Sequence, residues 1–370
     1  MPETTSLAKT PGLAKTPGLA KTPGLDKARG AAAPLDSSRV LEVRDVGKTF
    51  AVSGKGGRKQ LRALDGIDLD LRRGETLGLV GESGCGKSTL ARTLMMLERP
   101  DTGTVRWDGT DPYRLKGKDL LALRRKVQMV FQDPYASLNN RMTAAEIIGE
   151  PWRTHKDLYP RKRDRAARVR ELLHLVGLRP SDEHRSPQEF SGGQRQRLGI
   201  ARALSLDPEV IICDEPVSAL DLSVQAQVLN LLNELQQELD ISYIFISHDL
   251  SVVRHVADRV AVMYLGRIVE TGSTEAVFDH PAHPYTEALM SAAPTLDADN
   301  RRERILLSGE VPSPLNPPSG CRFRTRCAHA TDVCATALPP AVTDRQEAGH
   351  IAECYHPRGR VGLGMPAPAA

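Results

Sequence analysis

Two glycine-rich stretches of this sequence have the composition of phosphate-binding sites. Residues Gly81 to Ser88 read Gly-Glu-Ser-Gly-Cys-Gly-Lys-Ser. In such a loop the backbone N–H groups wrap an anion, Lys87 neutralises phosphate oxygens and Ser88 ligates Mg²⁺. The second stretch, Ser191-Gly-Gly-Gln194, precedes an expected helix, whose N-terminus offers unpaired N–H groups and a positive dipole end. It carries a hydroxyl but no lysine, so it predicts half of a phosphate site that another surface must complete.

A pair of carboxylates ends an apolar segment further along the chain, Val210-Ile-Ile-Cys-Asp214-Glu215. Asp214, at the end of the expected strand, can hold Mg²⁺ opposite Ser88. Glu215, one residue later, can polarise an attacking water as a general base. Acid pairs after strands are common, so the prediction rests on the position of this pair behind both phosphate motifs.

Three further polar residues fall at strand ends or turns, where an α/β sheet places phosphate chemistry. Gln132 follows Val130-Phe131 and can touch both Mg²⁺ and the attacking water, while His248 follows Phe245-Ile-Ser and can reach the γ-phosphate. Asp221 lies in the turn Ser218-Ala-Leu-Asp. Each residue alone is explained as a polar loop residue or a cap. Their order along the chain indicates nucleotide hydrolysis.

The elements that must position these residues alternate between strands and helices. Residues 76–80 form an apolar strand that enters the glycine loop, and residues 88–97 have the pattern of the following helix. Further strands are expected at 41–46, 67–71, 126–131, 210–213 and 243–247. Helical segments separate them, which predicts an α/β fold with a largely parallel sheet covered by helices.

Two helical regions stand out within this pattern. Residues 133–190 are dominated by charged helical stretches such as 161–176, which predicts a helical insert in the nucleotide domain. In 223–239 the apolar residues fall on one helical face, a stripe expected to face the core: Val224, Val228, Leu231, Leu235 and Leu239.

Composition limits the class of protein. With 370 residues the chain is long enough for about two domains, and its formal net charge of +4 is too small to indicate a nucleic-acid partner. No apolar run approaches the ~18 residues that span a bilayer, so work at a membrane is expected to go through partners. Six cysteines without an export signal indicate a reducing compartment, where clustered thiols bind metal more often than they pair.

The chain divides into four expected parts. Residues 1–38 are expected to be a disordered tail, because Leu-Ala-Lys-Thr-Pro-Gly repeats three times there and neither builds regular structure nor supplies a core. A basic tether to anionic lipid or nucleic acid is the alternative interpretation of this tail. Residues 39–290 are expected to form the nucleotide domain, 291–357 a small irregular module rich in proline, arginine and cysteine, and 358–370 a flexible end.

The set of motifs resembles the ATPase subunit of ABC transporters over roughly residues 40–280. The resemblance implies a P-loop nucleotide-binding domain, and a head-to-tail dimer that sandwiches two ATP molecules. It implies catalytic roles for Lys87, Gln132, Glu215 and His248, and Mg²⁺ ligation by Ser88, Gln132 and Asp214. Phe50 matches the aromatic residue that stacks on adenine. The nucleotide is further expected to contact Gly81, Glu82, Ser83, Gly84, Cys85, Gly86, Lys87, Ser88, Thr89 and Asp221, and, across the dimer, Ser191, Gly193 and Gln194.

Later segments are similar to the subunits that drive dipeptide and oligopeptide import. These segments are residues 131–139, 283–289 and 307–321, together with the cysteine series Cys321, Cys327, Cys334 and Cys354. The resemblance implies a peripheral subunit at the cytoplasmic face of the membrane, paired with a sister ATPase or a second copy of itself. It further implies two membrane permease subunits, and indirectly an external solute-binding protein.

Two other functions remain open at this point. Related importers carry nickel or other small solutes. A soluble ABC ATPase acting on DNA or ribosomes usually has long coiled coils, zinc inserts or two fused nucleotide domains, none of which this sequence has. No nucleic-acid partner is therefore expected.

The four late cysteines allow three interpretations. Their spacing does not fit a CxxC-type zinc ribbon. Some members of the resembled family hold a [4Fe–4S] cluster with four thiolates, and Arg322, Arg324 and Arg326 would help offset the negative charge of such a cluster. Such a cluster would also allow the module to act as a sensor that regulates the motor. Zinc is the second interpretation, and buried cysteines without a ligand are the third. Cys213, in the middle of a strand, is expected to be core.

Overall fold

The computed structural model describes residues 38–54, 57–292, 305–307, 309–344, 347 and 349–358. The repeats of residues 7–30 lie outside the described residues. The same holds for all but one residue of each expected tail, 1–38 and 358–370. The division of the remainder into a nucleotide domain and a C-terminal module stays a prediction.

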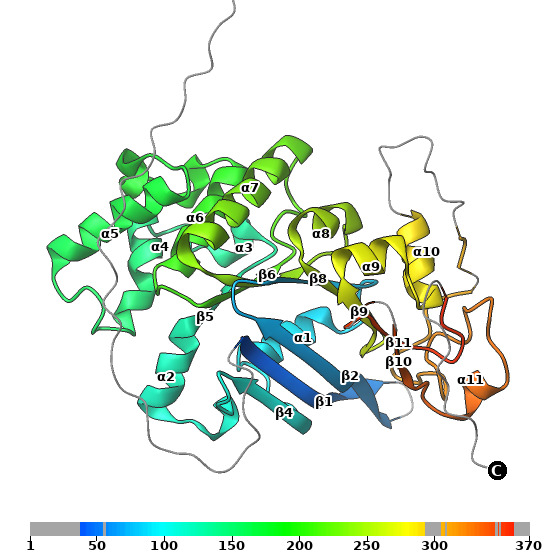
Figure 1. Cartoon of the computed structure of the whole chain (residues 1–370). Coiled ribbons are helices and arrows are strands. Elements are labelled where there is room, and N and C mark those ends of the chain that lie inside the picture. The colour runs from blue at the N-terminus through cyan, green and yellow to red at the C-terminus, as the bar shows by residue number, and fades with distance from the viewer. Residues whose placement is uncertain are drawn as a thin grey trace, which may run out of the picture. The chain divides into compact units, whose positions relative to one another are not determined.

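An eight-stranded sheet forms the centre of the structure (Figure 1). Its order is β10-β11-β9-β8-β3-β7-β6-β5, and the five strands from β8 to β5 are parallel. The strands are β3 (Thr76–Val80), β5 (Val127–Val130), β6 (Val210–Asp214), β7 (Ser242–Ile246), β8 (Arg259–Tyr264), β9 (Arg267–Ser273), β10 (Ala341–Thr343) and β11 (Ile351–Glu353). Strands β3, β6 and β7 are buried and apolar because helices cover both faces of the sheet, as in other parallel sheets.

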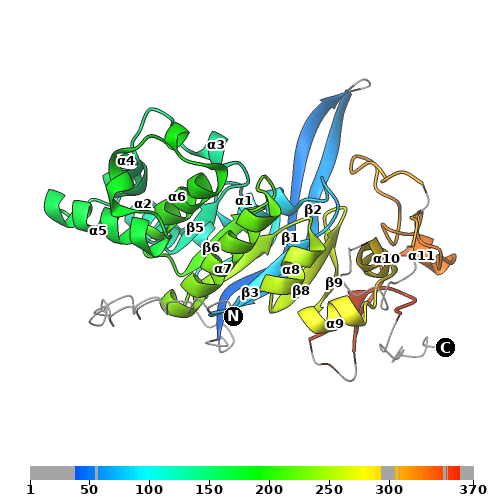
Figure 2. The same ribbon diagram turned by 90° about the horizontal axis from the view of Figure 1, so that it is seen from above.

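A second, antiparallel sheet has the order β2-β1-β4. Its strands are β1 (Arg39–Gly54), β2 (Gly57–Arg72) and β4 (Thr102–Trp107). The strands expected at 41–46 and 67–71 belong to this second sheet and not to the largely parallel one. They alternate apolar and polar residues because only one face packs on the core, with Val43 opposite Leu69, and this alternation suits an antiparallel pair. Figure 2 shows the β1–β2 hairpin extending well beyond the main sheet.

Helices cover both faces of the main sheet. Between the two sheets lies α1 (Lys87–Leu94), which shares one hydrophobic core with β1, β2 and one face of β3. The opposite face carries α6 (Gly192–Leu204), α7 (Leu222–Leu239) and α8 (Leu250–Val256) (Figure 1). The other helices are α2 (Gly117–Lys126), α3 (Pro134–Ser137), α4 (Ala144–Gly149), α5 (Lys162–Leu175), α9 (Thr274–Asp279), α10 (Pro284–Ala292) and α11 (Val333–Thr336).

The region predicted as a helical insert is helical in the structure. Helices α3, α4 and α5 all pack against α6, so the start of α6 is tied to this region. The expected apolar stripe of α7 is buried at Val228, Leu231 and Leu235 and partly buried at Val224. The prediction is wrong for Leu239, which is 41% exposed because it is the last residue of the helix and extends past the core.

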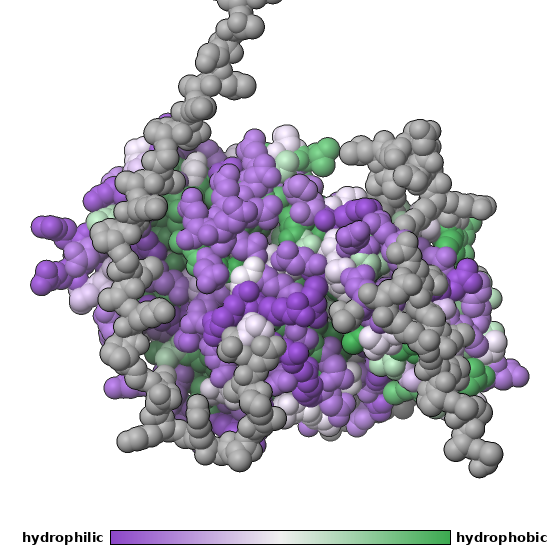
Figure 3. Space-filling model, viewed as in Figure 1, coloured by the Kyte–Doolittle hydropathy of each residue, from purple (hydrophilic) through white to green (hydrophobic). Residues whose placement is uncertain are grey.

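The described surface is mainly hydrophilic in the view of Figure 3, with hydrophobic residues in small separate patches. Among the described helices, none is both long and apolar enough to cross a membrane.

A buried charged cluster joins the last strands to the main sheet. His350 lies just before β11, and its Nε2 is 2.7 Å from the Glu270 carboxylate on β9. That carboxylate also accepts hydrogen bonds from the backbone N–H groups of Ala282 and His283, which lead into α10. Asp344 lies 3.7 Å from the other ring nitrogen of His350. Burial by itself lowers the pKa of His350, but the hydrogen bond and charge of Glu270, with the charges of Asp344 and Glu347, outweigh it and raise this pKa.

We expect the cluster to stabilise the fold more at low pH than at high pH. Because the folded-state pKa of His350 is raised above its ordinary value of 6.5, its contribution is complete below that value. It is lost as the pH rises through the folded-state pKa. The free energy of unfolding of the natural chain should therefore exceed that of His350→Gln most at about pH 5.5, and the difference should shrink by about pH 8.5. Denaturant titrations at both pH values measure this, and a difference that grows with pH contradicts the assignment.

Candidate functional site

The loop between β3 and α1 approaches other backbone too closely for side chains at two positions. At Gly81, φ is +154° and an added Cβ would lie 2.2 Å from the carbonyl oxygen of Met263. At Gly86, φ is +115° and a Cβ would lie 2.5 Å from the carbonyl oxygen of Ala63. Neither conformation suits an L-residue, so glycine is required at both positions. The loop is held against β2 and β8 in the shape that the glycines permit.

Lys87 is buried inside this loop. Its Nζ donates hydrogen bonds to the carbonyl oxygens of Gly81, at 2.7 Å, and Glu82, at 3.0 Å. The Sγ of Cys85 lies 3.8 Å from the same ammonium group. Burial raises the pKa of the Cys85 thiol although the charge of Lys87 opposes this, so the thiol stays neutral. Lys87 therefore supplies the positive charge at the centre of the loop.

Asp214 at the end of β6 lies beside the loop. Burial raises its pKa, and so does the neighbouring charge of Glu215, whereas the charges of Lys87 and Arg92 and a hydrogen bond with Ser88 lower it. The hydrogen bond brings together the hydroxyl and the carboxylate expected to bind Mg²⁺. These two oxygen donors are of the type that Mg²⁺ prefers.

The carboxylate of Glu215, at the end of β6, contacts two side chains that follow other strands. Its carboxylate accepts a hydrogen bond of 2.6 Å from Nε2 of Gln132, which follows β5. Its other oxygen lies 3.1 Å from Nδ1 of His248, which follows β7. The backbone N–H of Glu215 donates to Ile246 on β7, and its φ is +46°. This backbone turns the carboxylate toward the neighbouring strand ends.

Lys87, Gln132, Glu215 and His248 line a cavity of about 510 Å³. Its wall contains, from the expected nucleotide site, Ser83, Gly84, Cys85, Gly86, Lys87, Ser88, Thr89, Gln132, Glu215 and His248. It also contains residues that no motif indicated: Leu61, Arg62, Ala63, Leu265, Gly266 and Pro314. Of these, Gly266 donates its N–H to the carbonyl oxygen of Cys85 at 2.7 Å. Strand β2 brings Leu61, Arg62 and Ala63 to the loop, the turn after β8 brings Leu265 and Gly266, and Pro314 comes from the segment before α11; no sequence signal identifies them.

Phe50, expected to stack on adenine, is not part of the cavity wall. It lies on β1 opposite Leu61, which does line the cavity, and the ammonium of Lys48 is 5.4 Å from its ring centre. Gly81, Glu82 and Asp214 are adjacent to lining residues without being part of the wall.

The expected half-site lies away from this cavity. Ser191 caps the start of α6 by a reciprocal pair of hydrogen bonds with Gln194: the backbone N–H of each residue donates to the side chain of the other, at 3.0 and 3.3 Å. A Cβ at Gly193 would lie 2.2 Å from a methyl group of Val224 on α7. Asp221 caps α7 and accepts from Ser223 and Val224. None of the four expected residues lines the cavity around Lys87.

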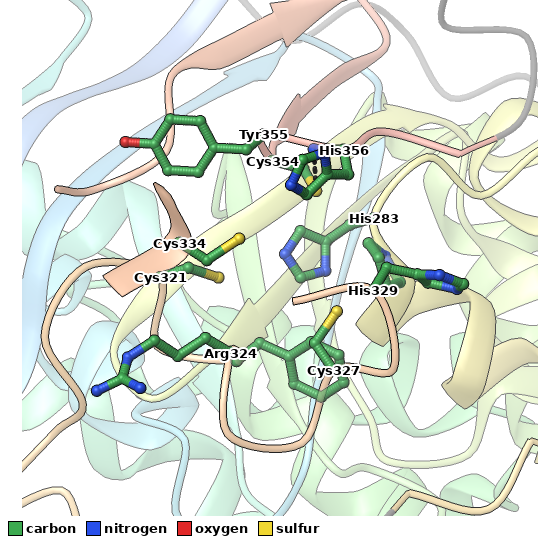
Figure 4. Close-up of a pocket in the computed structure, with 11 residues that line it drawn as sticks. His283, Cys321, Arg324, Cys327, His329, Cys334, Cys354, Tyr355 and His356 are labelled. Carbon is green, nitrogen blue, oxygen red and sulfur yellow. Dashed lines mark hydrogen bonds between the residues drawn. The ribbon is translucent and has the colours of Figure 1, made fainter. Parts of the chain in front are cut away.

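The four late cysteines line a second, small cavity. They share it with His283, His329 and His356 (Figure 4). In Figure 4 the sulfur atoms of Cys321, Cys327 and Cys334 point toward the space in which His283 lies. Burial raises the pKa of the Cys354 thiol to about 12. Within the described part of the chain, no three His, Cys, Asp or Glu side chains are close enough together to hold a metal ion as they stand. Cys213 is fully buried in β6, as predicted.

Of the three arginines between these cysteines, Arg324 is part of the cavity wall, whereas Arg322 and Arg326 are not. Arg322 donates to the carbonyl oxygen of Leu265 and pairs with Asp65. Arg324 donates to the carbonyl oxygen of Ser319 at 2.9 Å, and Figure 4 shows its guanidinium pointing away from the cysteines. Arg326 pairs with Glu82. The expectation that all three offset charge at the cysteines stays a prediction: Arg322 and Arg326 are paired with Asp65 and Glu82, whereas Arg324 lies in the wall that the cysteines share.

Comparison with known proteins agrees with this geometry. Residues 64–218 match the family model for ABC transporters, and residues 269–334 match the model for the C-terminal region of oligopeptide/dipeptide transporters. A dimeric structure of an ATP-binding cassette bound to ADP and phosphate superposes with a TM-score of 0.57 and 29% identity, covering 63% of this chain and 98% of that one.

Curated relatives match over most of their length. The oligopeptide transport ATP-binding protein AppF of Bacillus subtilis is 54% identical, over 81% of this chain and 92% of its own. OppF of Salmonella typhimurium is 56% identical over 76% of this chain and 84% of its own, and the dipeptide transport protein DppF of Escherichia coli is 50% identical over 85% and 94%. The glycine loop, the carboxylates at the strand ends and these matches together show that the chain belongs to the family of ATP-binding subunits of oligopeptide/dipeptide ABC transporters.

Proposed function

We propose that this chain is the ATP-hydrolysing motor subunit of an importer of dipeptides or oligopeptides. The observation that carries the proposal is the contact of Glu215 with both Gln132 and His248 in the cavity wall around Lys87. A carboxylate held between an amide and an imidazole, next to a phosphate-binding loop, suits the activation of a water molecule. The relatives named above favour peptide transport over nickel transport or an action on DNA or ribosomes.

The residues divide the chemistry among them. Lys87 and the loop backbone bind and orient the phosphates, and Glu215 accepts the proton of the attacking water. Gln132 orients one oxygen of the Glu215 carboxylate and the attacking water. His248 contacts the other carboxylate oxygen and can donate a hydrogen bond toward the γ-phosphate. Ser88, Gln132 and Asp214 would hold Mg²⁺, which would neutralise negative charge on the phosphates.

The full site is proposed to form between two ATPase chains. Ser191, Gly193 and Gln194 lie at the start of α6, outside the cavity of their own chain; Ser191 is exposed, Gln194 is half-buried and Gly193 is buried. The positive end of this helix can complete the phosphate site of a partner, either a sister subunit or a second copy. The dimeric form of the superposed cassettes supports this arrangement.

Exposed aromatic residues behind β5 support docking to membrane permease subunits. Phe131 is 43% and Tyr135 is 57% exposed. Each lies under an arginine of α6, since the guanidinium of Arg195 is 4.0 Å from the Tyr135 ring centre and that of Arg202 is 5.8 Å from the Phe131 ring centre. The aromatic surface is thereby linked to the helix that begins with Ser191. We place the subunit at the cytoplasmic face of the membrane, where two permease subunits would connect it indirectly with an external solute-binding protein.

Glu215→Gln should reduce steady-state ATP hydrolysis by about 100-fold or more, because it removes the general base. ATP binding should persist, since the phosphate loop is unchanged, and the ATP-bound dimer should accumulate. Phosphate release and size-exclusion chromatography with ATP measure the two effects.

Glu238→Gln makes the same chemical change on the exposed face of α7 and is the matched control. Its turnover should equal that of the natural chain. Undiminished hydrolysis by Glu215→Gln would refute the general-base role.

We further propose that Cys321, Cys327, Cys334 and Cys354 hold a [4Fe–4S] cluster, with a zinc ion as the alternative. Their side chains line one cavity, and four thiolates are the usual ligand set of such a cluster. The sulfur atoms would need to draw closer together than they lie here, because no three donors among the described residues are at metal-binding distance. The cluster would supply a crosslink between irregular segments and a redox-sensitive group.

Anaerobically purified protein should be brown and contain near-stoichiometric iron. Cys354→Ser should lose the iron, whereas Cys213→Ala, a core cysteine outside the cavity, should retain it. Metal analysis and visible absorption measure this. Colourless protein that contains zinc, or no metal, would overturn the cluster proposal.

A further inference from the structure

We propose that Arg326, which lies between Cys321 and Cys327, is a positioning residue for the phosphate loop. It holds the carboxylate of Glu82 in place and neutralises its charge. The inference rests on the proposed function, because it concerns the binding of ATP by the same loop. It assigns a role to the C-terminal region within the nucleotide site of its own chain.

Glu82 is held at three of its groups. Its carboxylate lies 2.9 and 3.1 Å from one guanidinium nitrogen of Arg326. Its backbone N–H donates to the hydroxyl of Tyr285 on α10 at 3.0 Å, and its carbonyl oxygen accepts from Lys87. The same carbonyl oxygen also accepts from the backbone N–H of Cys85 at 3.3 Å, so two of these four partners come from beyond residue 280. The start of the loop is therefore fixed partly by the C-terminal part of the chain.

Arg326 is itself fixed in place. It is 9% exposed, its backbone N–H donates to the carbonyl oxygen of Phe323 at 2.9 Å, and its guanidinium is 3.5 Å from the Tyr264 hydroxyl. Tyr264, Tyr285 and Phe323 pack against one another, with ring centres 4.6 to 5.4 Å apart. A buried guanidinium on such a support loses little entropy when it binds a carboxylate.

The charge of Glu82 explains why the loop needs this arginine. Glu82 lies between Gly81 and Ser83, in a loop whose backbone N–H groups are expected to bind phosphate. A negative charge there repels the phosphates of ATP unless a cation compensates it. Lys87 contacts only the backbone of Glu82, whereas Arg326 contacts the carboxylate. Arg326 thus removes an electrostatic penalty that the loop sequence creates.

The same segment also forms the wall of the cysteine cavity. Cys327 is the next residue after Arg326, and Phe323 lines that cavity as well as supporting Arg326. A change at the thiols can therefore reach Glu82 through a single residue of chain.

Titration of the full-length chain with a fluorescent ATP analogue, without Mg²⁺, tests the inference. Arg326→Met should bind about 10-fold more weakly, the size of coupling between contacting residues. Arg326→Met combined with Glu82→Gln should recover most of that loss, because the uncompensated charge is gone. Arg326→Lys, which keeps the charge, should bind more tightly than Arg326→Gln, and this pair replaces the methionine variant if that variant does not fold.

Arg358→Met is the matched control. It breaks another pair between the C-terminal residues and the rest of the chain, Arg358 with Glu287 at 3.4 Å, which does not touch the loop. It should leave the Kd unchanged. Equal Kd values for the natural chain and Arg326→Met, or no recovery in the double variant, would overturn the inference. A natural chain that does not bind the analogue at all would instead refute the proposed function.

Discussion

The carboxyl ends of four neighbouring parallel strands meet at one edge of the main sheet, and the proposed chemistry depends on this meeting. Strand β3 delivers the phosphate loop, β5 delivers Gln132, β6 delivers Asp214 and Glu215, and β7 delivers His248. In a parallel sheet all carboxyl ends lie on the same edge, so residues far apart in the chain become neighbours. The hydrogen bond from Glu215 to Ile246 ties two of these ends together directly.

Charge balance is the second constraint on the site. Lys87 is the buried cation inside the loop, while Asp214, Glu215 and Glu82 bring negative charge close to where the phosphates of ATP are proposed to bind. Each carboxylate has a partner that limits its repulsion: a hydroxyl and nearby cations for Asp214, an amide and an imidazole for Glu215, and Arg326 for Glu82. The C-terminal region thus contributes to electrostatics at the nucleotide site as well as to the fold.

The packing of the helical region connects the site to its surroundings. Helix α6 starts at the proposed half-site, receives α3, α4 and α5 along its length, and carries the arginines over Phe131 and Tyr135. Helix α6 therefore links the half-site proposed to act across a dimer with the aromatic residues proposed to contact permease subunits.

The sequence alone predicted the candidate site residues wherever they belong to a contiguous motif. The glycine loop, the acid pair and Ser191-Gly-Gly-Gln194 are recognisable because short runs determine their backbone geometry, and helices 162–175 and 222–239 follow from residue periodicity. The antiparallel sheet, the lining residues Gly266 and Pro314, the His350–Glu270 cluster and the Arg326–Glu82 pair were decided only by the tertiary structure. Those contacts join segments distant in the chain, and nothing in the local pattern states which distant partner will pack there.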